Sequence, residues 1–119
     1  MKKYNYENLE IYALANNIAI AVYELTRSFP KDEIFGIISQ LRRASVSIVL
    51  NIVEGYTRSS KKDFAMFIER SIGSTAEVRA ALQLSISLGF IEQSDANDIF
   101  ILIDEEYFKL QKFKKYLRS

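Results

Sequence analysis

Apolar residues recur every three or four positions along most of the chain, which is the spacing of a helix that packs one face against its neighbours. Three segments show this repeat clearly: its members are Ile11, Ala15, Ile18, Val22, Leu25 and Phe29 in the first, Ile34, Ile38, Leu41, Ser45, Ile48 and Ile52 in the second, and Ile99, Ile103, Leu110, Phe113 and Leu117 in the last. Glu106 occupies a position of the last repeat where an apolar residue is expected. The pattern predicts three amphipathic helices.

A fourth helical segment lies between the second and the last, but its repeat is partly small and polar. Its members are Phe64, Ile68, Ser71, Thr75, Val78, Leu82 and Ser85, and further small residues accompany them at Gly73, Ser74, Ala76, Ala80 and Ala81. Small side chains let a neighbouring backbone approach closely, because the distance between packed helices depends on the side chains at their contact. We therefore expect a tight crossing between this helix and a neighbour.

Three short breaks separate the four segments, around Pro30, at residues 55–60 and around Gly89. The predicted helices span residues 8–28, 35–55, 61–88 and 95–118. Short connections make consecutive helices antiparallel neighbours. The sequence therefore predicts an all-α protein, an up-down-up-down antiparallel four-helix bundle that forms a single domain over residues 1–119.

The residues at the breaks carry the usual signals for helix ends. Ser60 followed by Asp63 has the spacing of a capping box, and Ser94 precedes an acidic first turn. Gly55 and Gly89 stand where left-handed C-terminal caps are common.

The 119 residues include no Cys and no His, which excludes several kinds of chemistry. Nucleophilic sites that depend on His or Cys, iron–sulfur clusters, haem held by imidazole and ordinary zinc sites all need these side chains. A chain of this length can bury a single core without disulfides. We expect a protein that is not an enzyme, with no catalytic residues, cofactor or metal.

The longest uninterrupted apolar run has about six residues, far fewer than the roughly 20 that span a bilayer. No apolar segment typical of a secretory signal follows the two N-terminal lysines. We therefore expect a soluble, cytoplasmic protein without a membrane partner.

Charges are segregated although the totals nearly balance, with 16 Lys and Arg against 15 Asp and Glu. Residues 92–106 contain six acids and no base, whereas residues 107–119 contain five bases and no acid. One interpretation is that the last helix distributes its charges to match its macrodipole. The other is that its basic end meets phosphate or the acidic surface of a partner.

A second basic group flanks the break between the second and third helices. In an antiparallel bundle this break and the C-terminus of the last helix lie at the same end, so the two groups should form one surface. Such a surface can follow a phosphate backbone while Tyr56, Tyr107 and Tyr116 stack on bases, although a plain solvated surface is the alternative. The candidate nucleic-acid-binding residues are Arg42, Arg43, Arg58, Lys61, Lys62, Lys112, Lys114 and Lys115.

Polar residues also form a stripe along the second helix, flanking its apolar face, and the third helix offers matching groups. The candidate network comprises Arg43, Ser47, Asn51, Glu54, Ser74 and Glu77. It can fix helix register and oligomer contacts, form a nucleic-acid surface, or hold a metal-dependent active site on Glu54 and Glu77. If the network is buried, Glu54→Ala or Asn51→Ala should cost ~1–3 kcal/mol of stability.

Residues 39–82 resemble the family of four-helix-bundle proteins called 23S rRNA intervening-sequence proteins. The resemblance rests on the second-helix run SQLRRASVSIVLNIVEG and on a third helix with Phe64, Phe67, Gly73, Ser74 and Glu77 at the family's spacing. It extends over nearly the whole chain, because Tyr6, Leu9 and Tyr12 resemble the family's N-terminal pattern. Departures are mild: Tyr6 stands where Phe is common, Val49 where Pro is frequent and Val53 where Ala is frequent.

The resemblance implies a bundle without known catalytic activity that assembles as a ring, commonly a pentamer. Some members of the family are encoded in inserts of 23S ribosomal RNA genes. Similar proteins are accessory factors of diversity-generating retroelements and bind nucleic acid or a reverse transcriptase through a basic surface. The ribosomal wording records gene location and does not make the protein a part of the ribosome.

The leading hypothesis is a non-enzymatic homo-oligomer that binds structured RNA, other nucleic acid or a nucleoprotein partner. The alternative is a structural adaptor whose oligomeric surface recruits a protein without touching nucleic acid.

Overall fold

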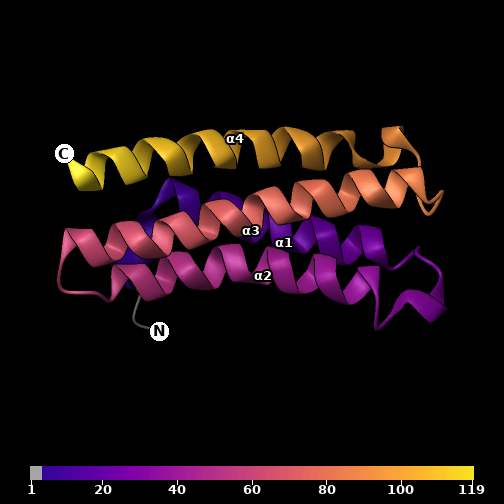
Figure 1. The fold of residues 1–119 in the computed structure, drawn as a ribbon, viewed down its shortest axis with the longest axis horizontal. Coiled ribbons are helices and arrows are strands. Elements are labelled where there is room, and N and C mark those ends of the chain that lie inside the picture. Colours follow the sequence, from indigo (N-terminus) through magenta and orange to yellow (C-terminus); the bar gives the residue numbers. More distant parts are fainter. Residues whose placement is uncertain (1–3) are drawn as a thin grey trace.

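Four long α-helices run alternately up and down along a common direction, joined by short connections (Figure 1). The structure is a computed structural model that describes residues 4–119. The helices are α1 (Glu10–Thr26), α2 (Ile37–Tyr56), α3 (Lys61–Ser87) and α4 (Gln93–Arg118), and short 3-10 turns η1 (Asn5–Asn8) and η2 (Lys31–Glu33) precede α1 and α2. The predicted all-α four-helix bundle is confirmed, with each helix end within two residues of its predicted position. The first three residues of the predicted domain lie outside the described part.

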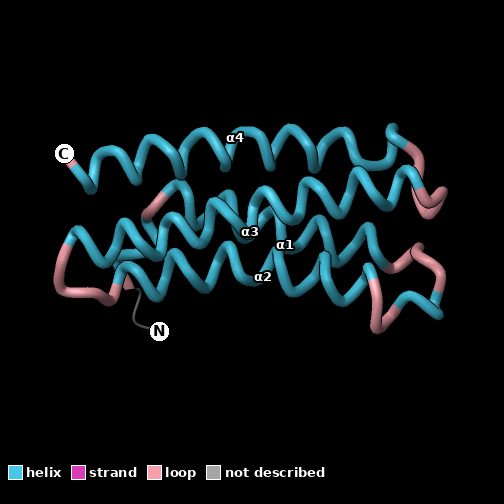
Figure 2. The backbone as a smooth tube through the Cα atoms, viewed as in Figure 1, coloured by secondary structure: helices cyan, strands magenta, loops and turns pink. Residues whose placement is uncertain are grey.

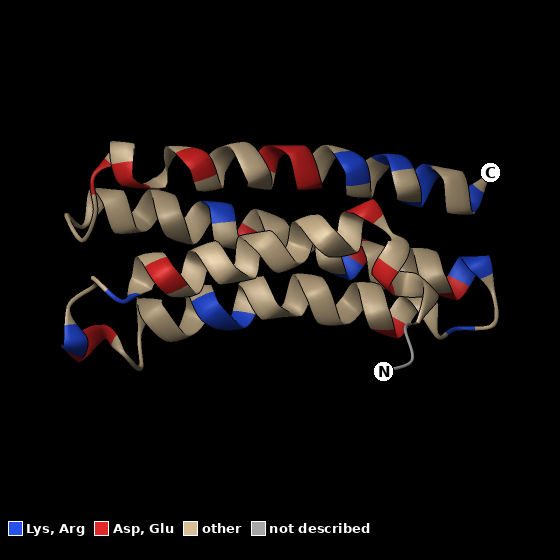
Figure 3. Cartoon of the chain, turned by 180° about the vertical axis from the view of Figure 1, so that it is seen from behind, with Lys and Arg blue, Asp and Glu red and all other residues tan. Residues whose placement is uncertain are grey.

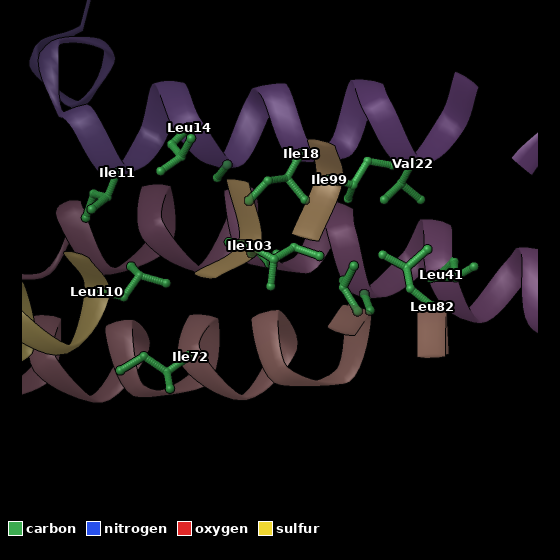
Figure 4. Packing of buried hydrophobic residues seen from close by; sticks show 14 of the residues in the cluster. Ile11, Leu14, Ile18, Val22, Leu41, Ile72, Leu82, Ile99, Ile103 and Leu110 are labelled. Atoms are coloured by element: carbon green, nitrogen blue, oxygen red, sulfur yellow. The ribbon is translucent and has the colours of Figure 1, made fainter. Parts of the chain in front are cut away.

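A single apolar core runs along the inside of the bundle. Figure 4 shows Ile11, Ile18 and Val22 of α1 directed toward side chains of α4 and α2. These side chains are almost fully buried, as are Ile103 and Leu110 of α4. The three- and four-residue repeat therefore identified most of the packed faces correctly. Ile34 is an exception, because it is 45% exposed and lies in the connection before α2. Within the described chain, no helix is long and apolar enough to cross a membrane.

The predicted close crossing occurs between α2 and α3. The hydroxyl of Ser71 donates a buried hydrogen bond of 2.9 Å to the backbone carbonyl of Ile48, so the α3 side chain reaches the α2 backbone itself. Ser74 also contacts α2, through a hydrogen bond of 2.9 Å to Ser47, whereas Gly73, Ala76 and Ala80 do not line this crossing, since they are exposed. Ser71 is therefore buried at the close approach of α3 to α2. The exposed small residues give the outer face of α3 few large side chains.

Two of the four expected caps are present. The backbone N–H of Asp63 donates to the Ser60 hydroxyl at 3.1 Å and starts α3. At the other end of α3, Gly89 has φ +80°, and the N–H groups of Gly89 and Phe90 bond to the carbonyls of Ile86 and Ser85. This is a Schellman motif, in which glycine supplies the left-handed residue.

Ser94 does not cap α4, contrary to expectation. Glu92 is the N-cap, and its side chain and that of Asp95 form a reciprocal capping box, with the Glu92 N–H donating to Asp95 at 2.9 Å. The two carboxylates satisfy the first N–H groups, so the helix begins before Ser94.

Gly55 is also not a left-handed cap, because α2 continues through it to Tyr56. Its missing side chain instead makes room for α3. A Cβ built at Gly55 would lie 2.8 Å from Phe64 Cδ1 and 2.8 Å from Phe67 Cβ. The glycine is required by this close contact between helices.

We predict that Gly55→Ala destabilises the protein by about 1–3 kcal/mol, because the added methyl overpacks the α2–α3 contact. Gly73→Ala is the matched control. This glycine is also helical, but a Cβ added there would meet no other helix and no side chain beyond its chain neighbours within 4 Å, so the helix preference of Ala should stabilise the protein by about 0.5–1 kcal/mol. Chemical denaturation at one protein concentration measures both. Equal effects at the two glycines would contradict the packing argument.

Glu106 lies inside the core, where the sequence pattern predicts an apolar residue. Its relative exposure is 0% and neither carboxylate oxygen has a hydrogen-bond partner among the described residues. Burial, reinforced by the charge of Glu105, raises the pKa of Glu106 to about 8, while Lys109 acts weakly in the opposite direction and Glu10 of α1 adds to the rise. The carboxyl group is therefore mostly protonated at neutral pH.

This burial predicts a pH-dependent stability. Below pH 4.5, the ordinary pKa of the group, both folded and unfolded chains hold the proton and the contribution of Glu106 is at its most favourable. Between that value and about 8, only the folded chain holds it, so the free energy of unfolding falls by about 1.4 kcal/mol per pH unit as pH rises. Glu106→Gln should abolish this slope in urea denaturation series, and Glu106→Leu should raise stability at pH 8 by about 1–3 kcal/mol. A wild-type slope retained in Glu106→Gln would show that other groups cause it.

Candidate nucleic-acid interface

Three parts of the chain that are distant in sequence meet at one end of the bundle. They are the N-terminal turn η1, the connection between α2 and α3, and the C-terminal end of α4 (Figure 2). The ammonium of Lys61, at the start of α3, lies 5.2 Å from the ring centroid of Tyr116 on α4. The predicted meeting of the α2–α3 break and the C-terminus is thus present.

A chain of aromatic contacts connects these segments. The ring centroid of Tyr6, in η1, lies 6.1 Å from that of Tyr56, and the ring centroid of Tyr56 lies 6.2 Å from that of Phe64. Phe64 lies 5.2 Å from Phe113, and Phe113 stacks at 6.1 Å on Tyr116. Edge-to-face and stacked pairs at these separations are favourable beyond the area they bury. They hold the end of the bundle together, and Tyr116 remains 59% exposed at its edge.

Basic side chains lie at the same end of the bundle as this aromatic cluster (Figure 3). The basic end, as we call it, consists of Arg58, Lys61, Lys62, Lys112, Lys114 and Lys115. Figure 3 shows the blue C-terminal half of α4 at the same end of the bundle as the blue residues near the α2–α3 connection. None of its five lysines forms an ion pair with another residue of the described chain.

Arg58 differs from the lysines because it already has partners. Its guanidinium pairs with Glu54 one turn earlier and lies 4.6 Å from the ring centroid of Phe67. Arg118, at the C-terminus, pairs with Glu69 of α3 at 3.5 Å. The free positive charge of this end is therefore carried by the lysines.

Arg42 and Arg43 do not join the basic end, although the sequence placed them in the same candidate set. They lie on the first half of α2, and the 15 residues between Arg42 and Thr57 span about 22 Å of helix. The Arg42 Nε donates to the Thr26 hydroxyl at 2.9 Å, and its guanidinium lies 4.7 Å from the ring centroid of Tyr23. Arg42 thus binds α2 to α1.

A shallow groove borders the basic end between the start of α1 and α4. Its volume is about 320 Å³, and its lining includes Leu9, Ile11, Phe113 and Tyr116. Lys109 at its edge donates to Glu10 at 2.5 Å, and this hydrogen bond raises the pKa of Lys109. No local sequence signal pairs these two residues, which are 99 positions apart. Lys109 is held by a carboxylate and is less available to an anion than its neighbours.

The structure connects half of the predicted polar network. Ser74 of α3 donates to the Ser47 hydroxyl of α2 at 2.9 Å, and Asn51 donates to the hydroxyl and the carbonyl oxygen of Ser47 at 2.9 Å each. All three side chains are partly buried. This hydroxyl–amide cluster ties the second and third helices together.

The other three members lie apart from this cluster. Arg43 is exposed and donates to Gln40 at 2.9 Å. Glu54 is exposed and pairs with Arg58, so the expected burial of Glu54 is wrong in the single chain. Glu77 is exposed and makes no hydrogen bond or ion pair within residues 4–119. Over the same residues, no group of three or more acidic side chains is arranged to hold a metal ion.

We predict that Ser74→Ala costs about 0.5–1.5 kcal/mol of stability, because it removes a partly buried hydrogen bond between helices. Glu54→Ala is expected to change stability by less than about 0.5 kcal/mol, since exposed ion pairs contribute little. Thermal or urea unfolding of the two variants measures the difference. A larger loss for Glu54→Ala than for Ser74→Ala would show that Glu54 is buried by something beyond the single chain.

Comparisons with known proteins agree with the fold. The family model described as 23S rRNA-intervening sequence protein matches residues 7–112. A crystal structure of a protein of unknown function from the S23 ribosomal protein family of Bacteroides thetaiotaomicron superimposes with a TM-score of 0.79 at 20% identity, covering 88% of this chain and 98% of that one. No curated protein matches the chain significantly. At this identity the crystal structure supports the bundle fold alone.

Proposed function

This chain belongs to the family of 23S rRNA-intervening sequence proteins, and from that premise we propose that it is a non-enzymatic, self-associating cytoplasmic bundle that binds structured RNA through its basic end. The observation that carries the proposal is the group of five lysines without ion pairs at one end of the bundle, where Lys61 lies 5.2 Å from the ring centroid of the exposed Tyr116. Lysines attract phosphates, and an exposed aromatic ring stacks on unpaired bases.

The balance of charge sets the expected strength of binding. The net charge is only +1. The acidic residues of α4 occupy its N-terminal half, which is the half farther from the basic end (Figure 3). Affinity for a nucleic acid grows with the number of phosphates that are neutralised and counterions that are released. Binding through a few lysines should therefore be moderate and strongly weakened by salt.

Self-association has separate support in the exposed apolar side chains. Leu50 of α2 is 59% exposed, and Ile101 and Phe108 of α4 are 65% and 63% exposed. Ile101 and Phe108 lie two turns apart on one face of α4, and exposed apolar residues that share a surface mark interaction sites more often than isolated ones do. The family resemblance suggests a ring, commonly a pentamer, as the assembled form. A reverse transcriptase or another nucleoprotein is a further candidate partner for the basic end.

We predict that Lys112→Gln/Lys115→Gln weakens binding to a structured RNA hairpin about tenfold at low salt, a change of about 1.4 kcal/mol. The slope of log affinity against log salt should also fall by about 1 for each lysine that contacts phosphate. Fluorescence anisotropy at about 50 and 150 mM salt measures both quantities.

Arg27→Gln/Lys31→Gln is the matched control, because it removes two exposed bases at the opposite end of the bundle. It should leave affinity nearly unchanged. An equal loss of RNA affinity in both variants would show that binding depends on the overall charge and not on the basic end. If the wild-type protein binds RNA at neither salt concentration, the proposal is refuted. The adaptor alternative would be favoured by two results together: both variants keep the wild-type affinity for RNA, and changes to exposed apolar residues abolish binding of a protein partner.

A further inference from the structure

A groove between α1 and α2 exposes apolar side chains beside two arginines. It has a volume of about 600 Å³, and its lining includes Tyr23, Arg42, Arg43, Val46 and Leu50. Arg42 is fixed there by its hydrogen bond to Thr26 and its contact with the Tyr23 ring. The groove therefore combines apolar side chains with two arginines, of which Arg42 is fixed and Arg43 is exposed, and its lining also includes Ser39, Ser47 and Asn51.

A stripe on the outer face of α4 has the complementary character. Asp98, Ile101, Glu105 and Phe108 are spaced by three, four and three residues, so they share one face of the helix. All four are exposed, and the buried residues of α4, such as Ile103 and Leu110, lie on the opposite face. Acidic and apolar side chains thus alternate along an exposed helix face, and at its C-terminal end the ammonium of Lys112 lies 5.5 Å from the ring centroid of Phe108.

The acidic members of this stripe have little compensation within the chain. Glu105 lies 3.8 Å from Lys109, which is held more closely by Glu10 at 2.5 Å. Asp98 makes no hydrogen bond or ion pair with any residue between 4 and 119. Both carboxylates are available to a basic partner.

We propose that the α1/α2 groove of one copy receives the α4 stripe of a second copy. The proposal rests on the self-association proposed above and specifies its surfaces. Leu50 and Tyr23 would meet Ile101 and Phe108, while Arg43 would face Glu105.

Charge decides between this contact and the symmetrical ones. Two grooves placed face to face would oppose arginines to arginines, and two stripes would oppose carboxylates to carboxylates, which is unfavourable. Pairing groove with stripe makes each contact oppositely charged. A contact between two different surfaces is head-to-tail, and it closes into a ring when the rotation between copies allows.

The test is charge reversal followed by measurement of mass by light scattering, without RNA. Arg43→Glu places a negative charge in the groove opposite Glu105, and Glu105→Arg places a positive charge on the stripe opposite Arg43. Each single variant should lower the mass of the assembly toward that of one chain of 13.7 kDa. The double variant Arg43→Glu/Glu105→Arg restores opposite charges and should recover the wild-type mass.

Arg70→Glu is the matched control, because Arg70 is exposed on α3 and belongs neither to the two surfaces nor to the basic end. It should leave the mass unchanged, and circular dichroism should show equal helix content in all variants. A wild-type mass of one chain would overturn self-association and this contact together. A wild-type assembly that both single variants retain, or one that the double variant fails to restore, would overturn the groove–stripe contact and leave self-association standing.

Discussion

The close approach of α3 to α2 is the constraint on which the rest of the bundle depends. A serine hydroxyl of α3 bonds to the carbonyl of Ile48 in the interior, and a glycine of α2 makes room for two phenylalanines of α3 near the connecting loop. Both contacts tolerate little sliding, because a hydrogen bond of 2.9 Å and a Cβ clash at 2.8 Å each fix the relative height of the helices. The register of α2 and α3 then places the basic loop beside the end of α4.

The same register explains how a nearly neutral protein presents a concentrated positive surface. Lysines from the start of α3 and from the last turns of α4 lie at one end of the bundle, where Lys61 contacts the ring of Tyr116 (Figure 3). The acids of α4 occupy the other half of that helix (Figure 3). The arrangement also agrees with the helix macrodipole, so stability and an anion-binding surface favour the same order of charges along α4. A dipole-matched helix and a nucleic-acid surface are therefore compatible interpretations of one pattern.

Glu106 shows the opposite relation, in which the core tolerates a costly group. A fully buried carboxyl group without a hydrogen-bond partner lowers the stability of the folded chain. The raised pKa of Glu106 has the same cause, because burial disfavours the charged carboxylate. The residues around it on α4, Ile103 and Leu110, bury enough apolar surface for the helix to dock nonetheless. The contacts within one chain give no reason for this residue type.

The sequence by itself determined the four helices, their antiparallel order and the gathering of the basic groups at one end. These features depend on periodicity and short connections, which are properties of neighbouring residues. Only the tertiary structure decided that Gly55 is a packing contact and not a cap, that Arg42 binds Thr26 16 positions away, and that Lys109 pairs with Glu10 99 positions away. Such pairings depend on how the helices are rotated and shifted against one another, and the spacing of residues within a single helix carries no information about that.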